Sequence, residues 1–316
     1  MSLSLAVVMD PIDQIKTYKD STFAMLLEAQ KRHWDLHYIE INDLSQLDGR
    51  SYANAAPLKV YDDQTHWFEL GQRQNQALDQ FNVILMRKDP PFDMEYIYVT
   101  YLLEQASDAG TLVINRPSAL RNANEKLSTA WFPELCTPTL VSRDAVQLNN
   151  FIREQQDVIL KPLDGMGGAS IFRVRKDDPN RNVIIETLTT HATRFTMAQK
   201  FVPEITAGDK RILVIDGEAV PYALARIPAQ GETRGNLAAG GTGVGVELSD
   251  RDWQIVETVA PRLREQGIMF AGLDVRGDYL TEINVTSPTC IRELDELYQL
   301  NIAGTLFNCI EQKLAV

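Results

Sequence analysis

Cysteine is scarce in this 316-residue chain, and no continuous apolar run is long enough to cross a membrane. The three cysteines, Cys136, Cys290 and Cys309, are far apart and odd in number, which indicates reduced thiols in a cytoplasmic protein. A membrane helix needs roughly 18 apolar residues, and the N-terminus shows no basic leader. We therefore expect no membrane partner and no secretory signal.

Basic residues and histidines are also few. Lys and Arg total 31 against 43 Asp and Glu, which gives a net charge of −12. A nucleic-acid partner is not expected for so acidic a chain, and any bound polyanion must meet a local basic pocket. The four histidines form no zinc-protease motif, and no G-x-S-x-G elbow is present. Zinc-protease and serine-hydrolase chemistry are therefore excluded.

Strand and helix patterns alternate over the first 120 residues. Apolar runs predict strands at 5–9, 36–41, 83–86 and 111–115 and helices at 21–32 and 96–105. This order favours a small α/β unit with a largely parallel sheet, although residues 42–80 are too irregular to place. Ligands bind beyond the carboxyl ends of such strands. The residues expected to face a substrate there are Asp20, Ser21, Arg87 and Asp89.

A glycine-rich loop joins two predicted strands in the middle of the chain. Lys161 ends the first strand, and the loop contains Gly165, Met166, Gly167, Gly168 and Ser170. Glycines let successive backbone N–H groups turn toward phosphate oxygens, and a serine hydroxyl adds a donor. Alone, such a loop is more often an ordinary turn. Lys161 and the upstream Lys126 favour phosphate binding, although neither a Walker motif nor a dinucleotide fingerprint is present.

The next segments have residue types that suit a nucleotide. We expect an adenine contact from Gln199, Lys200, Phe201 and Val202, and a ribose contact from Asp209. Arg211 suits a terminal phosphate, and Arg226 ends another strand. The glycine-rich stretch after it, which contains Arg234, reads as a lid. The alternative for the segments around Gln199 and Arg211 is a β-hairpin with solvated charges. The alternative for the glycine-rich stretch is a plain mobile linker.

A predicted hairpin between residues 272 and 285 carries the strongest signal. Glu282 and Asn284 are two residues apart on the return strand, so they share one face, which Leu280 is also expected to share. A turn at 276–278 brings Asp274 beside them. Two carboxylates and one amide oxygen suit a magnesium ion whose other ligands are phosphate and water. A lone Glu-x-Asn pair is usually just the polar face of an exposed hairpin.

Together these motifs resemble the ATP-grasp superfamily, and more closely the bacterial glutathione synthetase family. The resemblance rests on the segments 7–11, 84–93, 159–174, 233–241 and 280–292 and covers nearly the whole chain. It implies an α/β fold with an N-terminal parallel-sheet α/β domain followed by a two-part ATP-grasp domain with antiparallel sheets. The expected parts are an N-terminal substrate-binding domain at 1–122, a lid subdomain at 123–206, and a catalytic subdomain at 207–316 with a flexible loop at 227–243.

The resemblance also implies the reaction. ATP and Mg²⁺, with Mn²⁺ as an alternative ion, would activate the carboxylate of γ-glutamylcysteine as an acyl phosphate, and glycine would then attack it to give glutathione, ADP and phosphate. Asp274, Glu282 and Asn284 would hold the metal, and Arg211, Arg226 and Arg234 would be catalytic. Ser287 and Thr289 would receive glycine, and Asn236 would also bind substrate. A cytoplasmic homotetramer is implied as well. Two alternatives stay open: an ATP-grasp ligase of another substrate class, and a nucleotide-binding module without activity.

Overall fold

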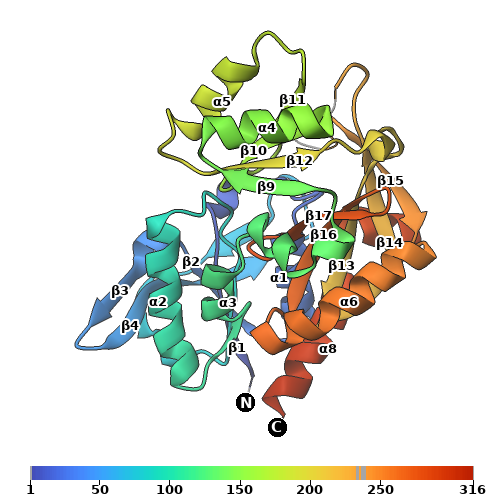
Figure 1. Cartoon of the computed structure of the whole chain (residues 1–316). Coiled ribbons are helices and arrows are strands. Elements are labelled where there is room, and N and C mark those ends of the chain that lie inside the picture. Colours follow the sequence, from blue (N-terminus) through green and yellow to red (C-terminus); the bar gives the residue numbers. More distant parts are fainter. Residues whose placement is uncertain (1, 233–234, 236–239, 316) are drawn as a thin grey trace.

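The computed structural model describes residues 2–232, 235 and 240–315. In chain order the strands are β1 (Ser4–Val8), β2 (Asp35–Ile39), β3 (Leu44–Leu47), β4 (Arg50–Val60), β5 (Phe68–Leu70), β6 (Gln74–Ala77), β7 (Val83–Met86), β8 (Leu112–Ile114), β9 (Thr139–Ser142), β10 (Asp157–Pro162), β11 (Phe172–Arg175), β12 (Thr196–Lys200), β13 (Asp209–Ile215), β14 (Glu218–Ile227), β15 (Thr242–Glu247), β16 (Phe270–Arg276) and β17 (Tyr279–Asn284). The helices are α1 (Ser21–Lys31), α2 (Met94–Asp108), α3 (Pro117–Asn122), α4 (Ala145–Gln155), α5 (Arg181–Thr189), α6 (Asp250–Gln266), α7 (Ile291–Tyr298) and α8 (Ile302–Leu314). Within the described residues the strands form three sheets (Figure 1).

The first sheet has eight strands and belongs to the N-terminal part of the chain. Its central strands β2, β1, β7 and β8 are parallel, as the sequence predicts. The region 42–80 supplies the antiparallel strands β3 to β6, with β4 pairing to β2, β3, β5 and β6. Alternation along β1 divides its side chains between two layers: Leu5 and Val7 pack in the cluster that includes α1, and Ala6 and Val8 pack in the one that includes α2.

The second sheet is antiparallel, with four strands in the order β11-β10-β12-β9. Helices α4 and α5 lie together over it at the top of Figure 1. Its interior is a separate hydrophobic cluster, formed by Leu148, Ile152, Val158, Leu160, Val174, Ile185, Leu188 and Ala198. This module therefore has a small core of its own.

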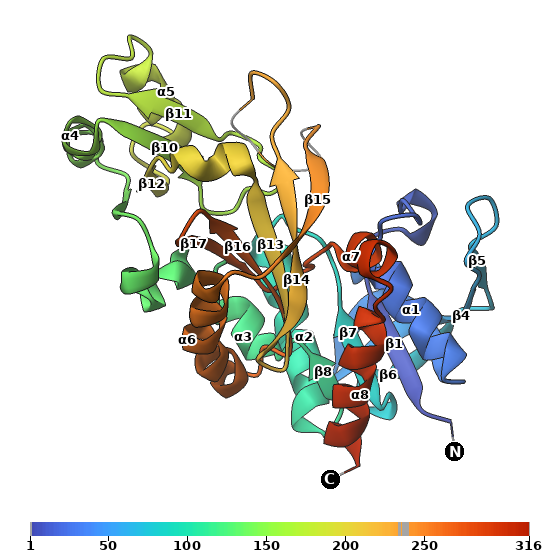
Figure 2. The ribbon, with the colours of Figure 1, turned by 90° about the vertical axis from the view of Figure 1, so that its right-hand side faces the viewer.

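The third sheet is also antiparallel, with five strands in the order β15-β14-β13-β16-β17. Figure 2 shows α6 on one side of this sheet and α7 and α8 on the other. Along β13, Ile212 and Val214 pack in the cluster that includes α6, whereas Leu213 and Ile215 pack in the one that includes α8. Because both clusters also contain residues of the first sheet, the N-terminal and five-stranded sheets share their hydrophobic interior.

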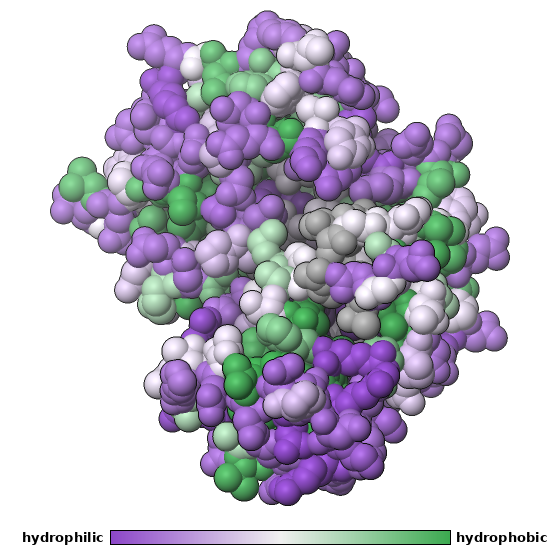
Figure 3. Space-filling view, turned by 90° about the horizontal axis from the view of Figure 1, so that it is seen from above, coloured by the Kyte–Doolittle hydropathy of each residue, from purple (hydrophilic) through white to green (hydrophobic). Residues whose placement is uncertain are grey.

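Helices α1, α2, α4, α6 and α8 begin where a short polar side chain accepts from a free backbone N–H group. Asp20 caps α1 by accepting from the backbone N of Phe23 at 2.7 Å. Among the described residues, no helix combines the length and the apolar character needed to span a membrane. The surface seen from above is largely hydrophilic, with hydrophobic residues in scattered patches (Figure 3).

Candidate active site

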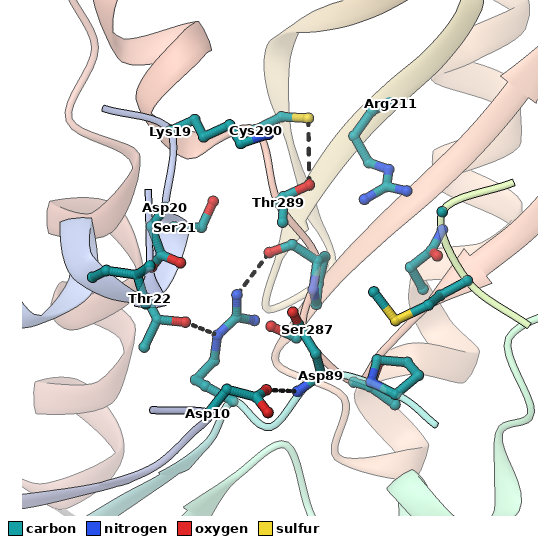
Figure 4. Close-up of a pocket in the computed structure, with 18 of the residues that line it drawn as sticks. Asp10, Lys19, Asp20, Ser21, Thr22, Asp89, Arg211, Ser287, Thr289 and Cys290 are labelled. Carbon is teal, nitrogen blue, oxygen red and sulfur yellow. Dashed lines mark hydrogen bonds between the residues drawn. The ribbon is translucent and has the colours of Figure 1, made fainter. Parts of the chain in front are cut away.

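A cavity of about 530 Å³ lies where loops of the N-terminal sheet, the glycine-rich loop and one face of the five-stranded sheet meet. Figure 4 shows side chains of the N-terminal loops, such as Asp20 and Asp89, around it together with Arg211 of the five-stranded sheet and Ser287 and Thr289. The predicted residues that line it are Asp20, Ser21, Arg87, Asp89, Gly165, Met166, Gly167, Arg211, Arg226, Asp274, Glu282, Asn284, Ser287 and Thr289. The structure thus brings together in one cavity residues that are up to 269 positions apart in the sequence.

The hairpin of β16 and β17 forms one wall of this cavity. Asp274 lies directly opposite Glu282, and Gly272 lies opposite Asn284. The side chains predicted to hold a metal therefore do gather on one hairpin. The expectation for Leu280 is wrong: a register shift after Asp274 inserts one extra residue into β17, and Leu280 packs in the same hydrophobic cluster as Ile283.

Two arginines bind the carboxylate of Asp274. Arg211 donates from Nε to Oδ1 at 2.5 Å and from Nη2 to Oδ2 at 3.1 Å. Arg226 approaches Oδ2 with Nη2 at 2.8 Å. Burial would raise the pKa of Asp274, but the two guanidinium groups outweigh it and hold this pKa far below its usual value. Asp274 is therefore a carboxylate with its charge fully paired.

Two lysines face Glu282 in the same way. Its Oε1 lies 3.2 Å from Nζ of Lys161 and 3.8 Å from Nζ of Lys126. Burial would raise the pKa of Glu282, but the two ammonium groups lower it to about 2. Burial in turn lowers the pKa of Lys161, which Glu282 only partly offsets. The Glu282 side chain is only 16% exposed, so it does not lie on the polar face of an exposed hairpin, the usual setting of a lone Glu-x-Asn pair.

The hairpin fits a hard divalent cation in its donor chemistry. Asn284 donates from Nδ2 to the carbonyl of Gly272 at 3.1 Å, which leaves its Oδ1 as the atom suited to bind a metal. Among the described residues, no three histidine, cysteine, aspartate or glutamate side chains group as a metal site. Asp274, Glu282 and Asn284 would thus supply a few oxygens, with nucleotide phosphates and water completing the shell.

The glycine-rich loop connects β10 and β11 directly over this hairpin. Lys126 reaches it from the start of the second part of the chain, with Nζ donating to the carbonyl of Gly165 at 2.8 Å. A small hollow of about 20 Å³ beside the cavity is lined by the loop, Lys126, Glu282 and Asp274. Gly167 and Gly168 have φ values of +63° and +83°, which glycine adopts readily. Ser170 has a φ of +56° and is exposed.

The residues expected to contact adenine lie at the edge of this arrangement. Gln199 and Lys200 end β12, and Phe201 and Val202 lead toward β13, so the four connect the two antiparallel sheets. Phe201 stacks against the guanidinium of Arg173, 3.6 Å from the ring centroid, and Gln199 and Val202 are buried while Lys200 is exposed. None of the four lines the large cavity.

The N-terminal side of the cavity combines acidic and basic groups. Arg87 is buried, donating from Nε to the hydroxyl of Thr22 at 3.0 Å and from Nη2 to the carbonyl of Pro288 at 2.9 Å. Burial raises the pKa of both Asp20 and Asp89, with Arg87 opposing the shift. Ser21 accepts from the backbone N of Ile291 at 3.1 Å.

Sequence comparison identifies the family. Models of the prokaryotic glutathione synthetase N-terminal domain and of its ATP-grasp domain match residues 3–121 and 125–299. Glutathione synthetase from Shewanella oneidensis is 58% identical over 99% of both chains, and the one from Yersinia pestis is 59% identical over 99% of this chain and 98% of its own. The chain belongs to the prokaryotic glutathione synthetase family. The family predicted from the sequence motifs is therefore confirmed.

Fold comparison agrees with this family. The ATP-grasp ligase PsnB, complexed with minimal precursor, Mg and ADP, matches with a TM-score of 0.64 at 15% identity, over 98% of this chain and 97% of that one. The predicted α/β fold with an ATP-grasp domain is confirmed. ATP-grasp ligases use ATP with a divalent metal ion.

Two predicted site residues have no described position, and two residues beside the site were not predicted. Arg234 and Asn236 lie outside the described residues, so the catalytic and substrate roles expected of them stay predictions. Sequence reasoning missed Glu125, whose Oε1 accepts from the backbone N of Val285 and Thr286. It also missed Arg276, which stands in a turn sequence that looks solvated but is largely buried. In both cases the partner is distant in sequence, and no local signal points to it.

Proposed function

We propose that this cavity joins γ-glutamylcysteine to glycine with the consumption of ATP, giving glutathione, ADP and phosphate. The observation that supports this most directly is the charge pattern on the five-stranded sheet. Five cations, Lys126, Lys161, Arg211, Arg226 and Arg276, surround three carboxylates, Asp209, Asp274 and Glu282. A chain of net charge −12 thus keeps a local excess of positive charge beside a glycine-rich loop, which suits a triphosphate.

The reaction needs an activated carboxylate because a free one is a poor electrophile. In the first step the cysteinyl carboxylate oxygen bonds to the γ-phosphorus as the bond to the β-phosphate oxygen breaks, which releases ADP. In the second, the glycine nitrogen attacks the acyl carbon, the C–O bond to phosphate breaks, and the amine loses a proton. Both steps depend mainly on positioning and charge neutralisation. Lys126 and Lys161 are placed to hold phosphate oxygens, and a bound divalent ion would neutralise further charge there.

The arginines at Asp274 are placed for the transferred group. A metal ion bound to Asp274 would share its two carboxylate oxygens with the guanidinium groups of Arg211 and Arg226. Arg226 also contacts Asp209, with Nη2 to Oδ2 at 2.7 Å, so its guanidinium is shared between the two carboxylates. We assign it the developing oxyanion of the tetrahedral intermediate, and we assign Arg211 the phosphoryl group.

In this proposal the amino-acid substrates bind between the N-terminal side of the cavity and the segment that follows the hairpin. The partly buried carboxyls of Asp20 and Asp89 suit the ammonium group of a γ-glutamyl donor, because a cation beside them offsets the cost of burying their charge. Arg87 positions this wall through Thr22 and Pro288. Ser287 and Thr289 present hydroxyls next to the hairpin and are assigned the carboxylate of glycine.

Several finer points belong to the same proposal. They are magnesium or manganese as the ion, the adenine contact at residues 199–202, the division at 1–122, 123–206 and 207–316, and a cytoplasmic homotetramer. The loop expected at 227–243 lies partly outside the described residues. Cys136, Cys290 and Cys309 are all free thiols, which accords with a reducing compartment.

A phosphate-release assay tests the proposal. The purified chain is given MgATP, γ-glutamylcysteine and a panel of amine acceptors that includes glycine, D-alanine and glutamate. Glycine-dependent release with one glutathione formed per phosphate supports the assignment. Turnover only with another acyl donor or amine contradicts the substrate assignment, and no turnover with any pair contradicts a catalytic role.

A further inference from the structure

Arg276 is the member of the charged network to which the reaction assigns no role. It ends β16, two residues after Asp274, and its guanidinium binds both carboxylate oxygens of Asp209, with Nε to Oδ1 at 3.1 Å and Nη2 to Oδ2 at 3.3 Å. Its side chain is 14% exposed. It also lines the small hollow under the glycine-rich loop together with Asp209 and Lys126. A cation so buried has a defined partner and faces the proposed nucleotide site.

Asp209 has a second cation, but the two differ in their other contacts. Arg226 lies across from Asp209 on β14 and divides its guanidinium between Asp209 and Asp274. Arg276 contacts Asp209 from the opposite side, on β16. In the proposed reaction Arg226 turns to the reacting group, and Asp209 would then lose one of its two partners. A buried carboxylate left without a cation is strongly unfavourable, so Arg276 is the partner that must remain.

The turn that carries Arg276 is held in place on both sides. Gly277 has a φ of +53°, and a Cβ there would lie 3.1 Å from Cβ of Glu204, so the turn packs closely against the segment that leads into β13. The carbonyl of Asp278 accepts from Nε of Arg251 at 3.0 Å. Arg276 therefore projects from a fixed hairpin end, whereas Arg226 lies near the end of β14.

We propose that Arg276 is a positioning residue that keeps Asp209 oriented as the hydrogen-bond acceptor for the ribose hydroxyls of ATP. The inference rests on the proposed function and deepens it, since it explains how Asp209 can serve the ribose while Arg226 serves the reacting group. A carboxylate that binds one guanidinium group through both of its oxygens still has lone pairs directed away from that group. The effect of Arg276 is thus on nucleotide selection and is transmitted through Asp209.

The test compares ATP with 2′-deoxy-ATP and 3′-deoxy-ATP in the ligation assay. We expect the unmodified chain to lose about tenfold in kcat/KM with the analogue that lacks the accepted hydroxyl, the scale of one charge-assisted hydrogen bond. Arg276→Ala should raise KM for ATP about tenfold with kcat changed less than about twofold. Its kcat/KM with the analogue should become about equal to its kcat/KM with ATP. Arg276→Lys, which keeps the charge but cannot bind both oxygens as the guanidinium does, should recover part of the discrimination.

Controls separate this role from a general loss of structure. Arg264→Ala removes an arginine of α6 that contacts the β13–β14 turn, at the other end of the same sheet, through the carbonyl of Asp216, and should leave discrimination unchanged. Asp209→Asn should abolish discrimination even if Arg276→Ala fails to fold. Equal losses with ATP and both analogues in Arg276→Ala, or a fall in kcat alone, would overturn the inference. Ligation by the unmodified chain without any preference for ATP would also overturn it, while leaving the proposed function intact.

Discussion

Glu282 has two kinds of partner in the proposed cycle, lysines in the free protein and a metal in the complex. Glu282→Gln keeps the shape of the side chain but removes the charge that both partners need. We expect ligation to fall by at least about 10²–10³-fold, the usual effect of losing one group that stabilises the reacting charge. Steady-state ligation with MgATP measures it. Glu28→Gln, a matched change at a glutamate on α1 that pairs with Arg32, should stay within about twofold.

The pH dependence of stability follows from the same residue. The pKa of Glu282 falls from its ordinary 4.5 to about 2 in the folded chain, so its contribution to stability is fully present above pH 4.5. It is lost as the pH falls from 4.5 toward 2, because the unfolded chain then binds the proton first. The shift corresponds to at most about 3 kcal/mol. In urea unfolding, the stability gap between the unmodified chain and Glu282→Gln should narrow between pH 5 and pH 3; a constant gap would show that the lysines do not act on Glu282.

Residue types near the hairpin were predictable, but their pairing was not. Asp274, Glu282 and Asn284 stand in a local pattern whose spacing places them on one face. The partners of that face, Arg211 for Asp274 and Lys161 for Glu282, are 63 and 121 residues away in sequence. Ion pairs of this kind depend on sheet order, which no local periodicity encodes. The roles proposed for these residues stay predictions.

At the scale of elements, Glu125 fastens the edge strand β17 to the start of the ATP-grasp part. Its carboxylate Oε1 accepts from the backbone N of Val285 at 3.0 Å, the backbone N of Thr286 at 3.1 Å and the Thr286 hydroxyl at 2.8 Å. Its own carbonyl accepts from the backbone N of Ile283 at 2.8 Å. Because β17 is the last strand of its sheet, these bonds replace the strand partner that it lacks.

Removing this carboxylate leaves buried donors without an acceptor. Glu125→Ala should lower the free energy of unfolding by about 2–4 kcal/mol. Glu125→Gln keeps a carbonyl oxygen in the same position and should lose less than half of that. Chemical denaturation without ligands measures both, so that effects on the cavity do not enter. Equal losses in the two variants would show that the acceptor geometry does not matter.

The strands that were predicted and those that were missed differ in burial. β1, β7 and β10 are continuous apolar runs with both faces covered, and such runs stand out in a sequence. The antiparallel strands from residues 42–80 are largely exposed on one face, and β4 includes Pro57. Polar edge strands carry little hydrophobic signal. The bulge in β17 was missed for another reason, since a one-residue insertion in a ladder depends on the partner strand.

At the scale of the molecule, the three sheets do not have three separate cores. The N-terminal and five-stranded sheets contribute to the same two hydrophobic clusters, and the four-stranded sheet has its own. Shared apolar burial makes the first two sheets cooperative. The four-stranded module instead contacts the rest through the glycine-rich loop and charged groups such as Lys161, which reaches Glu282. A triphosphate between them would add contacts to both bodies.

We therefore expect unfolding in two steps in the absence of nucleotide, with the four-stranded module first. Leu160→Ala, in the core of that module, should lower the free energy of the first transition by about 2–5 kcal/mol and leave that of the second unchanged. Leu213→Ala, equally buried in the five-stranded sheet, should lower the second. Hydrogen exchange at increasing denaturant resolves the two steps. Saturating MgATP should raise the free energy of the first transition toward that of the second. The nucleotide would contact both bodies, so the four-stranded module gains stability from it only while it stays packed against the rest of the chain. A single transition that both variants shift equally would mean that the module depends on the shared core.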